Sequence, residues 1–197
     1  MCMRKPVGED EAIEMNEALA EKRDFTADDL EAFPEDVQAE VIDGQIFYFA
    51  APKVIHQRLS GNLFISISNH IAEKKGTCEA FIAPVAVRLN CDDKTLVEPD
   101  VIVVCDKDKL YEDGCYGAPD LVIEVASKST RKRDYGLKMM KYRIAGVKEY
   151  WIVDPERETV MVNCFDDECQ TCLYSFDDEI TFHLFPELRV RVRDLIL

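Results

Sequence analysis

Two carboxylates set into apolar segments are the residues best suited to chemistry in this chain. Asp100 lies in Val97-Glu-Pro-Asp-Val101, and Glu124 lies in Leu121-Val-Ile-Glu-Val125. Such β-branched runs are typical of buried strands. A carboxylate in a buried strand is costly unless a positive partner neutralises it, so two of them on neighbouring strands indicate a shared cation. Because hard oxygen ligands select Mg²⁺, Mn²⁺ or Ca²⁺, the sequence predicts a divalent-metal site between these strands.

The order of short motifs resembles the Uma-type restriction endonuclease family of the PD-(D/E)XK nuclease superfamily. Pro99-Asp100 corresponds to the "PD" of that signature, and Glu124 to the acidic residue of its second strand. Each motif alone is common, but their order and spacing together are specific, and the resemblance runs from about residue 25 to the C-terminus. The matching segments are Glu40-Val-Ile-Asp-Gly44, 50–52 with His56, Gly61-Asn62, 97–100, 117–121, 124–127, Arg133-Asp134 with Lys138 and Tyr142, and 145–155.

The resemblance implies metal-dependent phosphodiester hydrolysis with Asp100 and Glu124 as metal ligands and the backbone carbonyl of Val125 as a third. Position 126 departs from the signature, because alanine stands where a lysine is expected. The resemblance implies that this lysine has moved to the following helix, at Lys138. Its ammonium would orient or deprotonate the attacking water, or stabilise the charge that develops on the phosphate. Lys138 and Tyr142 are four residues apart and should share a helix face.

Three further residues are candidates for auxiliary roles at the metal. Glu40 could bind the ion through water or bind a second ion, or it could be a surface residue at the start of a strand. His56 could contact a phosphate or act as an acid or base near neutral pH, or it could be structural. Glu98 is two residues before Asp100, so both should project from one strand face, and Glu98 could be an additional ligand.

Charge is distributed unevenly along the chain. The net charge of −15 opposes tight nonspecific binding of nucleic acid, but eight basic residues and a single acidic one, Asp134, fall between positions 128 and 148. This block begins directly after the Glu124 strand, where a substrate phosphate would lie. Either it faces phosphate, or it is a solvated helix face. The candidate phosphate-binding residues are Lys128, Arg131 and Arg133.

Periodicity and turn signals predict an α/β or α+β domain with a mixed sheet flanked by helices, which agrees with a restriction-endonuclease-like core. Asp43-Gly44 predicts a hairpin. Residues 1–24 are predicted to form an acidic, weakly packed extension, and 25–197 the domain. The predicted elements are helices near 26–33, 55–75 and 134–145, strands at 41–42, 46–50, 80–89, 96–104, 121–126, 148–153, 159–165, 171–176 and 189–192, and a loop at 106–119, with or without one helical turn.

The chain has no run of 18 apolar residues and no apolar segment near its N-terminus, so we expect no membrane span and a cytoplasmic location. In that compartment the eight cysteines should be reduced thiols, with Cys105 a small core residue. Cys169 and Cys172 have ligand spacing, and together with Cys164 they could form a zinc or thiol module. The more economical interpretation is a hairpin with incidental thiols.

The resulting prediction is a Mg²⁺- or Mn²⁺-dependent endonuclease that acts on DNA. The alternative is a catalytically inactive module that keeps the nuclease fold for binding or regulation, as Ala126 and the net charge of −15 would allow. Cleavage of both strands of a duplex usually needs two active sites, which a two-fold homodimer would supply. The residues leave the oligomeric state open.

Overall fold

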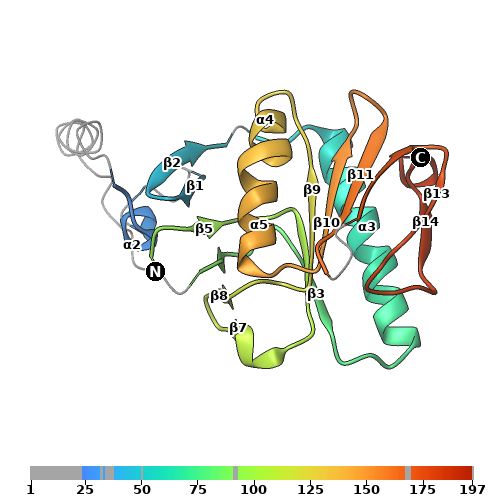
Figure 1. The fold of residues 1–197 in the computed structure, drawn as a ribbon, viewed down its shortest axis with the longest axis horizontal. Coiled ribbons are helices and arrows are strands. Elements are labelled where there is room, and N and C mark those ends of the chain that lie inside the picture. The colour runs from blue at the N-terminus through green and yellow to red at the C-terminus, as the bar shows by residue number, and fades with distance from the viewer. Residues whose placement is uncertain are drawn as a thin grey trace, which may run out of the picture.

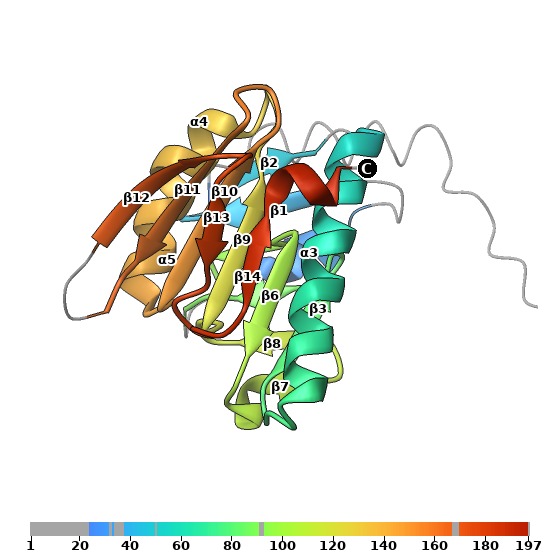
Figure 2. The same cartoon turned by 90° about the vertical axis from the view of Figure 1, so that its right-hand side faces the viewer.

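A computed structural model shows two six-stranded sheets, a separate two-stranded hairpin and flanking helices among the residues that it describes (Figures 1 and 2). The described residues are 24–31, 33, 38–49, 51–90, 93–166 and 170–196. Almost all of the predicted extension 1–24, and Cys169, lie outside them. The predicted mixed α/β architecture with flanking helices is confirmed.

The larger core is built on a mixed sheet whose central strands are buried on both faces. Its parallel pair is β9–β10, and its other neighbours are antiparallel. Side chains alternate between the faces, which explains why these strands appear as continuous apolar runs: Val103 packs into the core on one face and Ile102 into the core on the other. In order across the sheet, the strands are β12 (Gln170–Ser175), β11 (Thr159–Cys164), β10 (Glu149–Asp154), β9 (Leu121–Val125), β6 (Val101–Val104) and β3 (Glu79–Ile82).

Helices cover the two faces of this sheet (Figure 2). On one face lies α3 (Val54–Glu73), which buries Leu59, Leu63 and Ile67 against it. A continuous helical segment lies on the other face, and its Tyr142 is fully buried there. This segment consists of α4 (Arg131–Arg133), the π-helical turn η2 (Asp134–Lys138) and α5 (Met139–Ala145), and is closed by Gly146 with a φ of 97°.

The second sheet lies beyond the helical segment and includes the predicted hairpin. Asp43 and Gly44 adopt positive φ angles of 52° and 74° between β1 and β2, as a tight hairpin turn requires. In order, its strands are β2 (Gln45–Tyr48), β1 (Ala39–Ile42), β5 (Leu96–Val97), β4 (Val87–Arg88), β8 (Gly114–Tyr116) and β7 (Leu110–Tyr111). The remaining elements are α2 (Ala27–Glu31), η1 (Lys107–Lys109), β13 (Glu179–Thr181), β14 (Arg189–Arg191) and η3 (Val192–Leu195).

Two predicted strands and one predicted loop are corrected. The strands at 80–89 and 96–104 are each divided in two, at segments that contain Pro84 and Pro99. Proline has no N–H to donate to a ladder, so each chain segment leaves one sheet there and enters the other. The predicted loop at 106–119 contains one helical turn, η1, as the sequence allowed, but it also contains the short strands β7 and β8. Asp100 consequently lies where the chain crosses between the sheets.

A disulfide joins Cys78 to Cys105, so the prediction of reduced thiols is wrong for this pair. Cys78 and Cys105 each lie one residue outside the Glu79–Val104 pair of β3 and β6. Amino-acid composition alone does not indicate which strands pair. Within the described part of the chain, no helix is long and apolar enough to cross a membrane.

Candidate active site

A cavity of about 650 Å³ lies at the crossing point between the two sheets. It is bordered by the N-terminal turn of α3, the residues between β5 and β6, the end of β9 and the first turns of the helical segment. The predicted site residues that line it are His56, Glu98, Asp100, Glu124, Val125, Lys128, Arg133 and Lys138. Residues that are far apart in the sequence therefore meet around one space.

Glu124 projects from β9 toward the helical segment. Its Oε1 accepts hydrogen bonds from Lys138 Nζ at 2.8 Å and from the Tyr142 hydroxyl at 2.7 Å, as the four-residue spacing of those two residues predicts. Burial raises the pKa of Glu124 to about 8, and nearby carboxylates including Asp100 and Asp134 contribute, while Lys138 opposes the shift. Two hydrogen bonds therefore fix the position of this carboxylate, but the positive charge of Lys138 does not outweigh the effects that raise its pKa.

Asp100 directly precedes β6, at the end of the β6–β9 pair where β9 ends. Its Oδ2 accepts the Val125 N–H at 2.7 Å and lies 3.1 Å from His56 Nε2, in the first turn of α3. Burial alone would lower the pKa of His56, but the hydrogen bond and the charge of Asp100 raise it overall. A protonated His56 would partly balance Asp100, while its buried Nδ1 has no hydrogen-bond partner.

Lys138 lies at the floor of the cavity with 2% of its surface exposed. Burial would lower its pKa, but Glu124 and Glu40 raise it, so Lys138 carries a charged ammonium. Its Nζ is 2.5 Å from Glu40 Oε1 as well as 2.8 Å from Glu124 Oε1. Burial and the charge of Glu40 also raise the pKa of Glu98.

Acidic groups outnumber basic ones around Lys138, which suits a site for a divalent cation. Glu40 Oε2 and Asp134 Oδ1 are buried without hydrogen-bond partners. Among the described residues, no group of three or more His, Cys, Asp or Glu side chains is arranged to hold a metal ion. A set of two carboxylates completed by a backbone carbonyl and water would need only two such side chains. The carboxylates gathered here are Glu40, Glu98, Asp100, Glu124 and Asp134.

Glu40 and Glu98 are placed differently from their predicted positions. Glu40 lies inside β1 with none of its surface exposed, and it does not line the cavity. The inference that Glu98 and Asp100 share one strand face is wrong, since both lie between β5 and β6. Glu98 still lines the cavity, and its N–H donates to Glu40 Oε1 at 3.0 Å.

The three basic candidates also differ from one another. Lys128 is exposed and borders the cavity, as does Lys53, which sequence reasoning missed because no motif includes it. Arg133 lines the cavity with its guanidinium over the rings of Phe47 and Phe49, at 5.0 and 5.2 Å. Arg131 is not among the residues that line this cavity.

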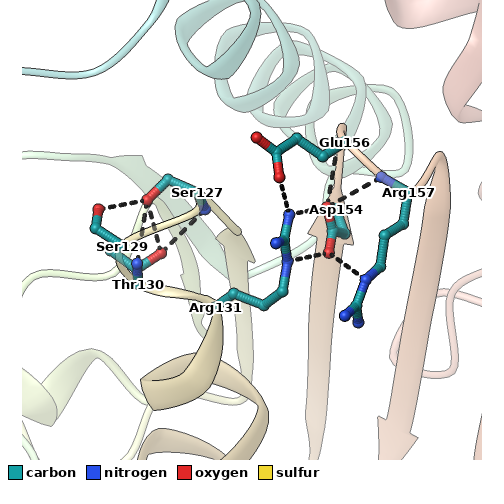
Figure 3. Close-up of polar contacts among 7 residues, drawn as sticks. All are labelled: Ser127, Ser129, Thr130, Arg131, Asp154, Glu156 and Arg157. Atoms are coloured by element: carbon teal, nitrogen blue, oxygen red, sulfur yellow. Dashed lines mark hydrogen bonds and ion pairs between the residues drawn. The ribbon is translucent and has the colours of Figure 1, made fainter.

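Arg131 instead joins the start of the helical segment to the end of β10 (Figure 3). Its Nε and Nη2 donate to the two carboxylate oxygens of the buried Asp154 at 2.6 and 3.0 Å, and Nη2 also donates to Glu156 at 2.7 Å. The preceding turn is closed by hydrogen bonds between Ser127 and Thr130. These contacts orient the helix that carries Arg133 and Lys138.

The cysteines at the β12 edge of the sheet do not form a metal site among the described residues. Cys164 and Cys172 are free thiols on the neighbouring strands β11 and β12, and they belong to no group of metal-ligating side chains in the described part. Cys169 lies outside the described residues.

Comparison with known proteins agrees with this fold. The Uma2 family model, described as "Putative restriction endonuclease", matches residues 26–193, so the chain belongs to the Uma2 family. The family predicted from motif order is confirmed. A crystal structure of "a putative nuclease belonging to DUF820" from Anabaena variabilis ATCC 29413 has the same fold, with a TM-score of 0.70 and 22% sequence identity. The alignment covers 87% of this chain and 97% of that chain. No curated protein matches.

Proposed function

We propose that this protein is a metal-dependent nuclease that hydrolyses phosphodiester bonds of DNA. The observation that carries the proposal is the meeting of Asp100, Glu124 and Lys138 at one cavity, in a chain whose family is described as "Putative restriction endonuclease". Two carboxylates with a neighbouring ammonium are the groups that metal-assisted phosphodiester hydrolysis needs.

Asp100 and Glu124 would hold Mg²⁺ or Mn²⁺, with the Val125 carbonyl as a further ligand. A cation there would supply water activation and charge neutralisation at the phosphate. The Tyr142 hydroxyl keeps Glu124 in one orientation. Lys138 would donate a hydrogen bond to the attacking water or to a phosphate oxygen, where its charge stabilises the transition state.

Positive charge around the cavity would attract the DNA backbone although the chain as a whole is acidic. Lys53 and Lys128 are exposed at the cavity border, and Arg133 lies deeper. The N-terminus of α3, a helix of 20 residues, borders the same space and adds the positive end of its dipole. These features support a phosphate-bearing substrate.

The test is a cleavage assay at low salt with supercoiled plasmid and single-stranded DNA, in Mg²⁺, Mn²⁺ or EDTA. We expect metal-dependent cleavage by the wild-type protein and its loss in Asp100→Asn, with an unchanged melting temperature. Asp106→Asn, at the exposed opposite end of β6, is the matched control and should cleave normally. Cleavage that persists in EDTA, or in Asp100→Asn, would contradict the proposal. DNA binding without cleavage would favour the inactive binding module instead.

A further inference from the structure

We propose that Glu40 is a positioning residue that holds the Lys138 ammonium in place, and that it is not a metal ligand. The proposal rests on the proposed function, because it assigns a role to Lys138 in cleavage. It replaces the role that the sequence suggested for Glu40, which was binding of the ion through water or binding of a second ion.

Burial and contacts separate Glu40 from the cavity. None of its surface is exposed, and the cavity is lined by Lys138 and Glu98 but not by Glu40. Its Oε1 is already in contact with Lys138 Nζ at 2.5 Å and with the Glu98 N–H at 3.0 Å. An ion in the cavity would therefore meet Lys138 before it could reach Glu40.

The π-helical turn explains how one carboxylate serves two cations. In an α-helix of 3.6 residues per turn, residues five apart project about 140° from one another. Arg133 and Lys138 are five apart, but η2 (Asp134–Lys138) between them is π-helical, with hydrogen bonds from i to i+5, so both side chains can reach β1. Arg133 Nε lies 3.7 Å from Glu40 Oε2, while Lys138 meets Oε1.

Glu40 thus holds Lys138 from β1, while Glu124 contacts it from β9. Without the Glu40 charge, the ammonium would keep Glu124 as its one close ion-pair partner among the described residues, and its position relative to a phosphate would change. Outer contacts that orient an active-site group typically cost about 10- to 100-fold in activity when they are removed. We expect a loss of that size in the turnover rate of Glu40→Gln, with little change in KM for DNA.

A double-mutant cycle with Lys138→Met tests whether Glu40 acts through Lys138. If it does, Glu40→Gln should cost about 10- to 100-fold in the wild-type background and less than about twofold in the Lys138→Met background. Glu79→Gln is the matched control, because it removes the carboxylate partner of an exposed lysine, Lys107, at the far end of β3, and it should have no effect. An equal loss in both backgrounds would overturn the proposal.

Calorimetric titration of each variant with Mn²⁺ provides a readout that does not depend on cleavage. Mn²⁺ affinity should be lost in Asp100→Asn and stay close to that of wild type in Glu40→Gln. A loss in Glu40→Gln equal to that in Asp100→Asn would make Glu40 a ligand and overturn the proposal. If Glu40→Gln does not fold, Glu40→Asp takes its place, because it keeps the negative charge on a side chain that is one methylene shorter. Its Mn²⁺ affinity is then compared with that of Asp100→Asn in the same way. A wild-type protein that binds Mn²⁺ without cleaving DNA would contradict the proposed function, while the Mn²⁺ titration would still decide the role of Glu40.

Discussion

At the scale of single residues, the raised pKa of Glu124 connects the site to the stability of the fold. Its ordinary pKa is 4.5, and burial raises it to about 8 in the folded protein. Below both values the carboxyl is protonated in the folded and unfolded chain alike. As pH rises from 4.5 to 8, the unfolded chain loses this proton first, so Glu124 lowers the free energy of unfolding progressively.

Glu124→Gln should remove this pH dependence. In EDTA, the stability of the variant relative to wild type should increase from about pH 5 to about pH 8, by an amount on the order of a few kcal/mol. Urea unfolding at several pH values measures the difference. A difference that stays constant between pH 5 and pH 8 would mean that Glu124 is already ionised across this range.

At the scale of elements, the placement of Lys138 depends on how the helical segment joins the sheet. Arg131 and Asp154 form a bidentate ion pair at that junction, and the carboxylate has no exposed surface (Figure 3). Removing one partner of a buried, charge-assisted pair leaves the other without compensation. The junction therefore contributes to stability and to the geometry of the site together.

Arg131→Met should lower the free energy of unfolding by about 1–3 kcal/mol, because the remaining contacts of Asp154 only partly replace the guanidinium. The same variant should lower the cleavage rate while Mn²⁺ affinity is kept. Arg189→Met removes an exposed arginine that pairs with Glu179 at 3.1 Å, and it should change stability by less than about 0.5 kcal/mol. Equal stability effects of the two substitutions would show that the buried junction contributes nothing beyond an exposed ion pair.

Local sequence patterns predict some of these elements and miss others for a physical reason. The hairpin at Asp43-Gly44, the long helix α3 and the strand β9 follow from turn chemistry and apolar periodicity within a few residues. Local patterns miss the division of two strands at the segments containing Pro84 and Pro99. The two halves of each divided strand pair in different sheets, with strands that are distant in the sequence.

The candidate site likewise contains residues that local sequence patterns predict and one, Glu40, whose role they do not predict. Asp100, Glu124 and Lys138 belong to the motifs on which the predicted family resemblance rested, and they meet at one cavity. The role proposed for Glu40 depends on contact with Lys138, 98 positions later in the chain, and on a π-helical turn that no local pattern indicates. The sequence pattern that could have indicated this role is a single carboxylate among the apolar residues of β1. The burial of β1 in the structure shows why that carboxylate needs a charged partner.

At the scale of the whole molecule, a net charge of −15 means that nucleic acid must be attracted locally against general repulsion. Lys53 and Lys128 are exposed on different segments that border the cavity, one just before α3 and one just after β9. Lysines that contact phosphates release counterions from DNA, so their contribution appears in the salt dependence of binding.

Lys53→Glu and Lys128→Glu, alone and combined, should raise KM for DNA and leave the turnover rate of bound substrate nearly unchanged. Each lost phosphate contact should reduce the slope of log affinity against log salt by about 0.9 for duplex DNA. Binding titrations of Asp100→Asn with a labelled duplex across a range of salt concentrations measure this slope without cleavage. Lys107→Glu, exposed at the opposite end of β6, makes the same change in net charge and should leave the slope as it is. If Lys107→Glu weakened binding as much as Lys128→Glu, the attraction would come from the total charge of the molecule, and the cavity border would have no special role in holding the DNA backbone.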